Sequence, residues 1–181
     1  RKGGGDGMAK GITSIALAAC LILAQGMPLS VAVKVEPSEV VRYYDVPLNR
    51  ELQDHLFAVC EEYAVPAELV LAIIAVESEF NWQAKSTTGD YGLMQINECN
   101  LGWLGEEVGI TNAYNPFQNI TAGVYILAQC WADDLSETLM RYNCGPGGAA
   151  ILRSKGVTET AYTHKVLAEY SKLKEAGKCT Q

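Results

Sequence analysis

The chain has few of the residues that build metal sites. It contains two histidines, His55 and His164, which stand far apart among its 181 residues, and no Cys-X-X-Cys pair. Structural zinc sites need four His or Cys ligands, usually supplied in closely spaced pairs. The sequence therefore predicts no metal, and nothing in it calls for another cofactor.

Positive charge is also scarce. The chain carries 14 Lys and Arg against 21 Asp and Glu, a net charge of −7. Removing residues 1–32 would leave 11 basic and 20 acidic residues, a net charge of −9. Proteins that hold nucleic acid or an anionic surface by charge need a basic excess. The composition excludes that class of binding and predicts no nucleic-acid partner.

No apolar run reaches the roughly 20 residues that span a bilayer. Residues 12–24 follow Lys10 and have about the length of the apolar segment of a secretory signal. We therefore expect residues 1–32 to be an upstream extension and export signal, cleaved after Ala32. The segment "LAAC" leaves lipid attachment at Cys20 open. An uncleaved signal that anchors the protein in the membrane is a further alternative. The expected location is extracellular, periplasmic or associated with the cell wall.

Five cysteines would remain after such cleavage: Cys60, Cys99, Cys130, Cys144 and Cys179. In an oxidising compartment they could form up to two disulfides and leave one thiol. Reduced cysteines packed as small hydrophobic residues are the alternative. The spacing does not choose between them.

The remaining chain divides into a lead-in and one mainly α-helical domain. Residues 33–46 show no helical period and are expected to be extended, whereas residues 47–181 carry helical patterns almost throughout. The helical signals are an amphipathic stripe over Asn49–Tyr63, an apolar segment after Pro66, a start at Asn115 and Pro116, a short helix "LMRYN" ended by "CGPGG", and a last helix from near Thr158 to near Gly177. Between the second and third signals, Thr87–Leu93 is expected to be a loop or a short hairpin.

The segment "AELVLAIIAVE" places a carboxylate, Glu77, at the end of a helix that is apolar on every side. Such a helix belongs at the centre of a domain. A carboxylate there is partly desolvated, which raises its pKa toward the range that a general acid needs near neutral pH. Solvation of Glu77 at a turn is the alternative. Glu79, two residues on, points to a different side of the helix and is no close partner.

Four segments resemble the soluble lytic transglycosylase family in the family's order. "ESEFNWQAKSTTGDYGLMQIN" is similar to its catalytic segment, and "NPFQNITAGVYIL" to the helix that follows. "RYNCGPGGA" is similar to its Ala-Tyr-Asn-Ala-Gly motif, and "ETAYTHKVL" to its closing segment. The resemblance covers residues 65–167. It implies a lysozyme-like single domain, with irregular loops or a short hairpin around the active site.

The resemblance also implies a reaction on peptidoglycan glycan strands. Members cleave the β-1,4 bond between N-acetylmuramic acid and N-acetylglucosamine and close a 1,6-anhydro ring on the muramoyl unit. One Glu serves first as acid and then as base, and Glu77 occupies its position. Because the attacking hydroxyl belongs to the substrate, no second carboxylate is needed to activate water.

Further site residues are carried over from the matching motifs. The resemblance implies substrate binding by Ser86, Gln95, Tyr142, Asn143, Glu159 and Tyr162. Among the three tryptophans, Trp82 is the favoured sugar platform because it lies beside the catalytic segment.

Three departures from the family pattern matter. Trp82 stands where the family commonly has Pro, which leaves the reaction intact. Asp90 replaces an Ala, and if its carboxylate reaches the far face of the sugar the enzyme would be a hydrolytic muramidase. Cys144 also replaces an apolar residue, and a disulfide from it to Cys99 or Cys130 would hold the loop of the site.

Two other hypotheses remain open at the level of the sequence. The chain could bind peptidoglycan with a vestigial site, although Glu77, Ser86, Gln95 and Tyr142 are all present. The chain has no recognisable wall-binding repeat, so a secretion, conjugation or phage machine could recruit it to the wall. Remodelling of the wall during growth is the other role left open.

Overall fold

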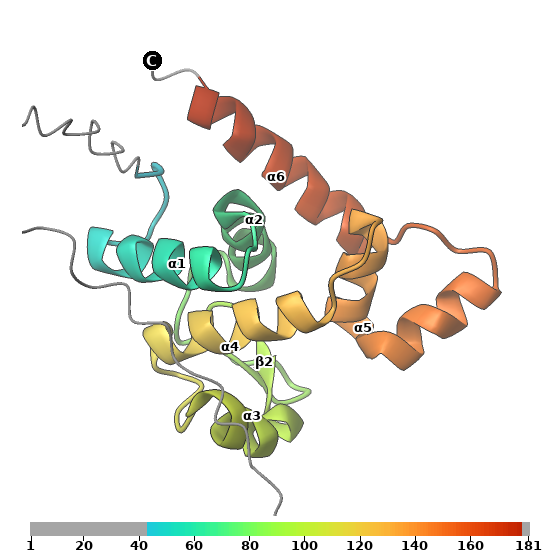
Figure 1. Ribbon diagram of the computed structural model, residues 1–181, viewed down its shortest axis with the longest axis horizontal. Helices are drawn as coiled ribbons and strands as arrows, with labels where there is room; N and C mark the ends of the chain where they lie inside the picture. The colour runs from blue at the N-terminus through green and yellow to red at the C-terminus, as the bar shows by residue number, and fades with distance from the viewer. Residues whose placement is uncertain (1–42, 179–181) are drawn as a thin grey trace, which may run out of the picture. The chain divides into compact units, whose positions relative to one another are not determined.

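The computed structural model describes residues 43–178. The expected export signal, Cys20, most of the lead-in and Cys179 lie outside these residues. The elements are α1 (Arg50–Glu62), α2 (Ala67–Ser78), β1 (Asp90–Tyr91), β2 (Ile96–Asn97), a 3-10 turn η1 (Glu98–Asn100), α3 (Leu101–Val108), α4 (Pro116–Gln129), α5 (Leu135–Ser154) and α6 (Ala161–Lys178). The mainly helical fold expected from the sequence is confirmed (Figure 1).

Helix α2 forms the centre of the domain. Every side chain from Leu69 to Ile74 is fully buried, as its apolar surface on all sides predicts. Helix α6 packs along α2, while α1 packs against α2 and α4 (Figure 1). Each buried Leu or Ile contributes about 1.5–3 kcal/mol of transfer free energy. This packing fixes the position of the last turn of α2, where Glu77 lies.

Two asparagine caps set the starts of α1 and α4. Asn49 Oδ1 accepts a hydrogen bond from the Leu52 amide at 2.9 Å. Asn115 Oδ1 accepts from the amides of Phe117 and Gln118 at 3.0 and 3.2 Å. Pro116 occupies the first helical position, where no amide hydrogen is needed. Both helix starts predicted from the sequence are confirmed.

A hairpin of two antiparallel strands, each two residues long, follows α2. Asp90 pairs with Asn97 in its register, so the predicted short hairpin is confirmed. The fully buried Asn119 of α4 fixes it in place. Its Oδ1 accepts from the Met94 amide, and its Nδ2 donates to the carbonyls of Tyr91 and Ala113, each at 2.8 Å. The hairpin is therefore bonded to the helical core.

Helix α5 is broken where the sequence predicts a break. Gly145 has φ 73° and ψ 162°, which no helix contains, and Pro146 begins the second arm. The first arm starts at Leu135, before the predicted "LMRYN", and the second arm continues to Ser154. That second arm and α3 were not predicted from the sequence.

Two tyrosines of the predicted lead-in form hydrogen bonds to the helices. The Tyr43 hydroxyl donates to Asp54, and the Tyr44 hydroxyl donates to Glu68 at 2.7 Å. Within residues 43–178, none of the helices combines the length and apolarity needed to cross a bilayer.

Candidate active site

Glu77 lies in the last turn of α2 as a half-buried carboxylate. Burial raises its pKa from 4.5 to about 7, a hydrogen bond from Tyr162 lowers it, and the charge of Asp90 adds to the rise. The Tyr162 hydroxyl donates to Glu77 Oε1 at 2.8 Å. This group therefore holds and releases a proton near neutral pH, as an acid–base catalyst must.

The chain turns sharply directly after Glu77. Glu79 and Phe80 both have positive φ, 50° and 64°, a backbone conformation that residues other than glycine rarely adopt. The Ser78 hydroxyl contacts the Leu93 carbonyl at 2.8 Å. The end of α2 is thus bonded to the hairpin, which holds Glu77 at the edge of the core.

Glu77 lines a cleft of about 730 Å³. Its walls come from the hairpin, η1, α3, the end of α4 and the middle of α5. The lining residues are Glu77, Ser86, Asp90, Gln95, Ile96, Asn97, Cys99, Asn100, Trp103, Ile126, Gln129, Cys130, Arg141, Tyr142, Asn143, Cys144, Gly145 and Pro146. Five of the seven predicted site residues belong to this set: Glu77, Ser86, Gln95, Tyr142 and Asn143.

Asp90 is held as an anion in this cleft. Burial opposes its ionisation, but hydrogen bonds from Ser86, Thr88 and Asn97 lower its pKa below the ordinary value. Thr88 Oγ1 donates to Asp90 Oδ2 at 2.6 Å, and Asn97 Nδ2 donates to Oδ1 at 2.8 Å. Because the Ser86 hydroxyl also donates to Oδ2, its hydrogen is already engaged. Both oxygens of Asp90 are occupied, which makes it a weak base.

Gln95 and Tyr142 face the cleft and bond to the backbone. Gln95 has φ 48°, and its Nε2 donates to the Gly92 carbonyl at 2.8 Å. The Tyr142 hydroxyl donates to the Met94 carbonyl at 2.9 Å. Burial and the charge of Glu77 raise the pKa of Tyr142 well above its ordinary value, so the phenol stays neutral.

The other predicted positions differ in their surroundings. Tyr162 reaches the site through its bond to Glu77. Glu159 lies outside the cleft lining, and its half-exposed carboxylate pairs with His164 at 2.6 Å. Of the tryptophans, Trp103 lines the cleft and the favoured Trp82 does not. Trp103 was ranked below Trp82 because it lies apart from the catalytic segment, on a helix that the sequence did not reveal.

The disulfide predicted for Cys144 is not formed. Cys60, Cys99, Cys130 and Cys144 are all free thiols. Cys144 Sγ instead donates to the Met140 carbonyl at 3.0 Å, within its own helix. Among residues 43–178, no group of three or more His, Cys, Asp or Glu side chains could hold a metal ion.

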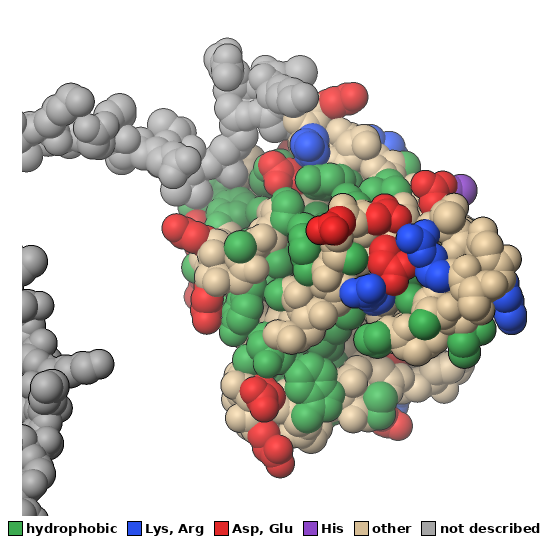
Figure 2. All heavy atoms as spheres, turned by 45° about the vertical axis from the view of Figure 1, so that its right-hand side comes forward, with side chains coloured by type: hydrophobic (Ala, Val, Ile, Leu, Met, Phe, Trp, Pro, Cys, Tyr) green, Lys and Arg blue, Asp and Glu red, His purple; other side chains and the backbone are tan. Residues whose placement is uncertain are grey.

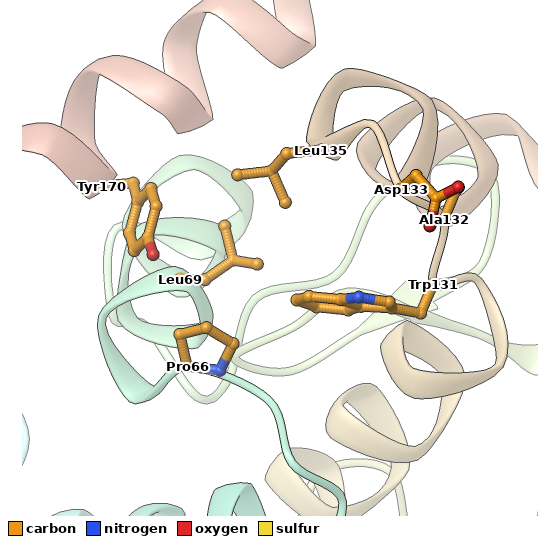
Figure 3. A pocket seen from close by; sticks show the side chains of 7 residues that line it. All are labelled: Pro66, Leu69, Trp131, Ala132, Asp133, Leu135 and Tyr170. Atoms are coloured by element: carbon orange, nitrogen blue, oxygen red, sulfur yellow. The ribbon is translucent and has the colours of Figure 1, made fainter.

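A smaller hollow of about 360 Å³ lies at the opposite end of α2. Figure 3 shows Trp131 and Asp133 on one side of it and Pro66, Leu69 and Tyr170 on the other. Asp133 is its single titratable carboxylate. This hollow contains none of the predicted site residues and has about half the volume of the cleft at Glu77.

The sequence matches a known domain family over most of the folded region. The model of the transglycosylase SLT domain matches residues 56–162, from the second half of α1 to the first residues of α6. The chain belongs to this family. The matched SLT region contains Glu77 and every other predicted site residue.

Two curated relatives carry related names. The SLT chain is 29% identical to a transglycosylase of Enterobacteria phage PRD1 over 118 residues, 64% of this chain and 42% of the relative. It is 37% identical to membrane-bound lytic murein transglycosylase F of Desulfosudis oleivorans over 89 residues, 44% of this chain and 19% of the relative. The chain thus spans less than half the length of either.

Solved structures share the fold of the SLT chain. An inactive glutamate-to-glutamine mutant of the lytic transglycosylase Slt from Pseudomonas aeruginosa superposes with a TM-score of 0.62 and 19% identity, covering 75% of this chain and 25% of that one. The 70 kDa soluble lytic transglycosylase of Escherichia coli gives 0.60 and 22%, covering 69% and 24%. The lysozyme-like fold implied by the sequence resemblance is confirmed.

Proposed function

We propose that the chain is an exported lytic transglycosylase of peptidoglycan. It cleaves the β-1,4 bond between N-acetylmuramic acid and N-acetylglucosamine and leaves a 1,6-anhydromuramoyl end. The observation that carries the proposal is Glu77, a carboxylate with a pKa raised to about 7 that lines a cleft of about 730 Å³. The names of the curated relatives agree with this activity.

Glu77 performs both proton transfers in this reaction. In its protonated form it donates its proton to the glycosidic oxygen as the bond to C1 breaks. The resulting carboxylate then accepts the proton of the muramoyl C6 hydroxyl as that oxygen bonds to C1. No water is consumed, and Glu77 ends protonated. A pKa close to ambient pH makes both forms accessible, and the Tyr162 hydroxyl steadies the carboxylate between the steps.

The surroundings of Asp90 favour this reaction over hydrolysis. A hydrolytic muramidase would need a second carboxylate to take a proton from water. Asp90 is the second acid in the cleft, but its oxygens accept three hydrogen bonds and its pKa is lowered. Its negative charge instead raises the pKa of Glu77. We therefore assign Asp90 to tuning Glu77.

The remaining cleft residues position the glycan. Gln95 and Asn143 offer amide groups, and Tyr142 forms a neutral wall beside Glu77. Ser86 lines the cleft, and its hydroxyl fixes the carboxylate of Asp90 by donating to it while accepting from the amides of Thr88 and Asp90. Glu159 affects the site only from outside the cleft lining.

The proposal extends to the organisation of the chain. Residues 1–32 act as the upstream extension and export signal, residues 33–46 as the lead-in, and residues 47–181 as the catalytic domain. The apolar run after Lys10 supports export.

The test compares the protein with its Glu77→Gln variant on purified peptidoglycan sacculi. We expect the wild type to clear the suspension and the variant to sediment with sacculi without clearing them. Equal clearing by both proteins would remove Glu77 from the chemistry. Binding without clearing by both would mean that the protein only binds the wall.

A further inference from the structure

The cleft contains one basic side chain. Of the described residues that line it, Arg141 alone is a lysine or arginine. It lies on the first arm of α5, directly before Tyr142, where the family motif quoted above has Ala. Its side chain is 37% exposed. A cation at this place is therefore a feature of this chain rather than of the motif.

Arg141 is anchored by one end of its guanidinium. Its Nε donates to Glu137 Oε1 at 2.8 Å, one helical turn earlier. The other oxygen of Glu137 lies 3.0 Å from Arg153 Nε. Within residues 43–178, nothing accepts a hydrogen bond from the two terminal Nη groups of Arg141. These groups carry four of the five donors of the side chain. The guanidinium is therefore held at Nε, while its Nη donors have no acceptor among the described residues.

The charges around Arg141 leave it only partly neutralised. The single carboxylate of Glu137 serves two guanidinium groups, and Asp134 lies 3.9 Å from Arg153 rather than from Arg141. The other anion in the cleft, Asp90, is occupied by three hydrogen bonds. The guanidinium of Arg141 therefore offers its remaining positive charge to an anionic group of a ligand.

We propose that Arg141 binds a carboxylate carried on the muramoyl side chain of the glycan. This inference rests on the proposed function. The sugar rings of peptidoglycan are uncharged, and carboxylates occur on the lactyl group at C3 or on the stem peptide attached to it. A planar guanidinium binds a carboxylate through two parallel hydrogen bonds. Arg141 thereby distinguishes muramic acid strands from uncharged N-acetylglucosamine polymers.

The experiment measures binding in the Glu77→Gln background, where no cleavage occurs. Three ligands of equal ring number are compared: a chito-oligosaccharide, a peptide-free peptidoglycan fragment with its lactyl carboxylate, and a peptide-bearing fragment. Arg141→Gln should weaken binding of a carboxylate-bearing fragment about tenfold, the loss expected for a charge-assisted pair. Binding of the chito-oligosaccharide should not change. The fragment that loses affinity identifies the carboxylate as lactyl or peptide.

Two variants separate substrate binding from a structural role. Arg153→Gln disturbs the same Glu137 carboxylate from outside the cleft lining and should keep the preference for carboxylate-bearing fragments. Arg141→Lys keeps the charge without the fork and should lose part of that preference. An equal loss for all three ligands, or no loss for any, would overturn the proposal.

The outcome for Arg141 is separable from that for the enzyme as a whole. In the active protein, Arg141→Gln should raise KM for peptidoglycan with little change in kcat, because Arg141 contacts no reacting atom. If the wild type cleaves peptidoglycan and Arg141→Gln keeps its kcat/KM, the inference about Arg141 alone fails. If the wild type itself cleaves no peptidoglycan, the proposed function fails.

Discussion

Replacing Glu77 by Gln should stabilise the fold at pH 8 and have much less effect at pH 4. The pKa of Glu77 is raised from 4.5 to about 7 in the folded protein. Between these values the folded protein holds a proton that the unfolded chain has released. The free energy of unfolding of the wild type therefore falls as the pH rises through this window. Gln has no proton to lose and escapes this fall.

The size of the effect follows from the same pKa. At about 1.4 kcal/mol per pKa unit, the rise from 4.5 to about 7 corresponds to an upper limit of about 3.5 kcal/mol. Because the carboxylate is half-buried and keeps some contact with solvent, we expect the gain from Glu77→Gln to grow by about 2 kcal/mol between pH 4 and pH 8.

Urea unfolding followed by circular dichroism at pH 4, 6 and 8 measures this difference. The matched control is Glu79→Gln, which removes a negative charge from an exposed side chain two residues away. It should not reproduce the gain. A Glu77→Gln stability difference that is independent of pH, or larger at pH 4 than at pH 8, would refute the desolvation of Glu77 on which the mechanism depends.

Three further predictions concern groups around Glu77 and the hairpin. Tyr162→Phe removes the hydrogen bond that lowers the pKa of Glu77, so the basic limb of the pH profile of kcat/KM should move up by about one unit; an unmoved limb would contradict this. Asp90→Asn removes a charge that raises that pKa, so the limb should move to lower pH while the 1,6-anhydro product persists. Abolished cleavage would instead make Asp90 a catalytic base. Asn119→Leu breaks three buried hydrogen bonds and should lower the free energy of unfolding by about 3 kcal/mol; a loss below about 1 kcal/mol in urea unfolding would show that the hairpin needs no such anchor.

The helices that the sequence predicted well are those with local signals. Asn115 caps α4 through its own side chain, and the apolar run from Leu69 to Ile74 fills the core because no side of it is polar. Helix α3 was missed for the opposite reason. Gly102 and Gly105 lower its intrinsic helix propensity, and the full burial of Leu104 in the core compensates for them.

The candidate site was predictable in its central residue and less so in its contacts. Glu77 stands out because a carboxylate ends an apolar helix. Its partner Tyr162 lies 85 residues away along the chain, and only the packing of α6 on α2 brings the two together. The engagement of Ser86 by Asp90, and the opening of Arg141 into the cleft, likewise depend on how loop and helix fold in three dimensions.

The most direct test of the account is mass spectrometry of the muropeptides that the protein releases from purified peptidoglycan. We expect products with non-reducible 1,6-anhydromuramoyl ends, one water lighter than hydrolysis products, and no products from Glu77→Gln. Reducible muramic acid ends would contradict it, because they would require a water nucleophile and a base other than Glu77.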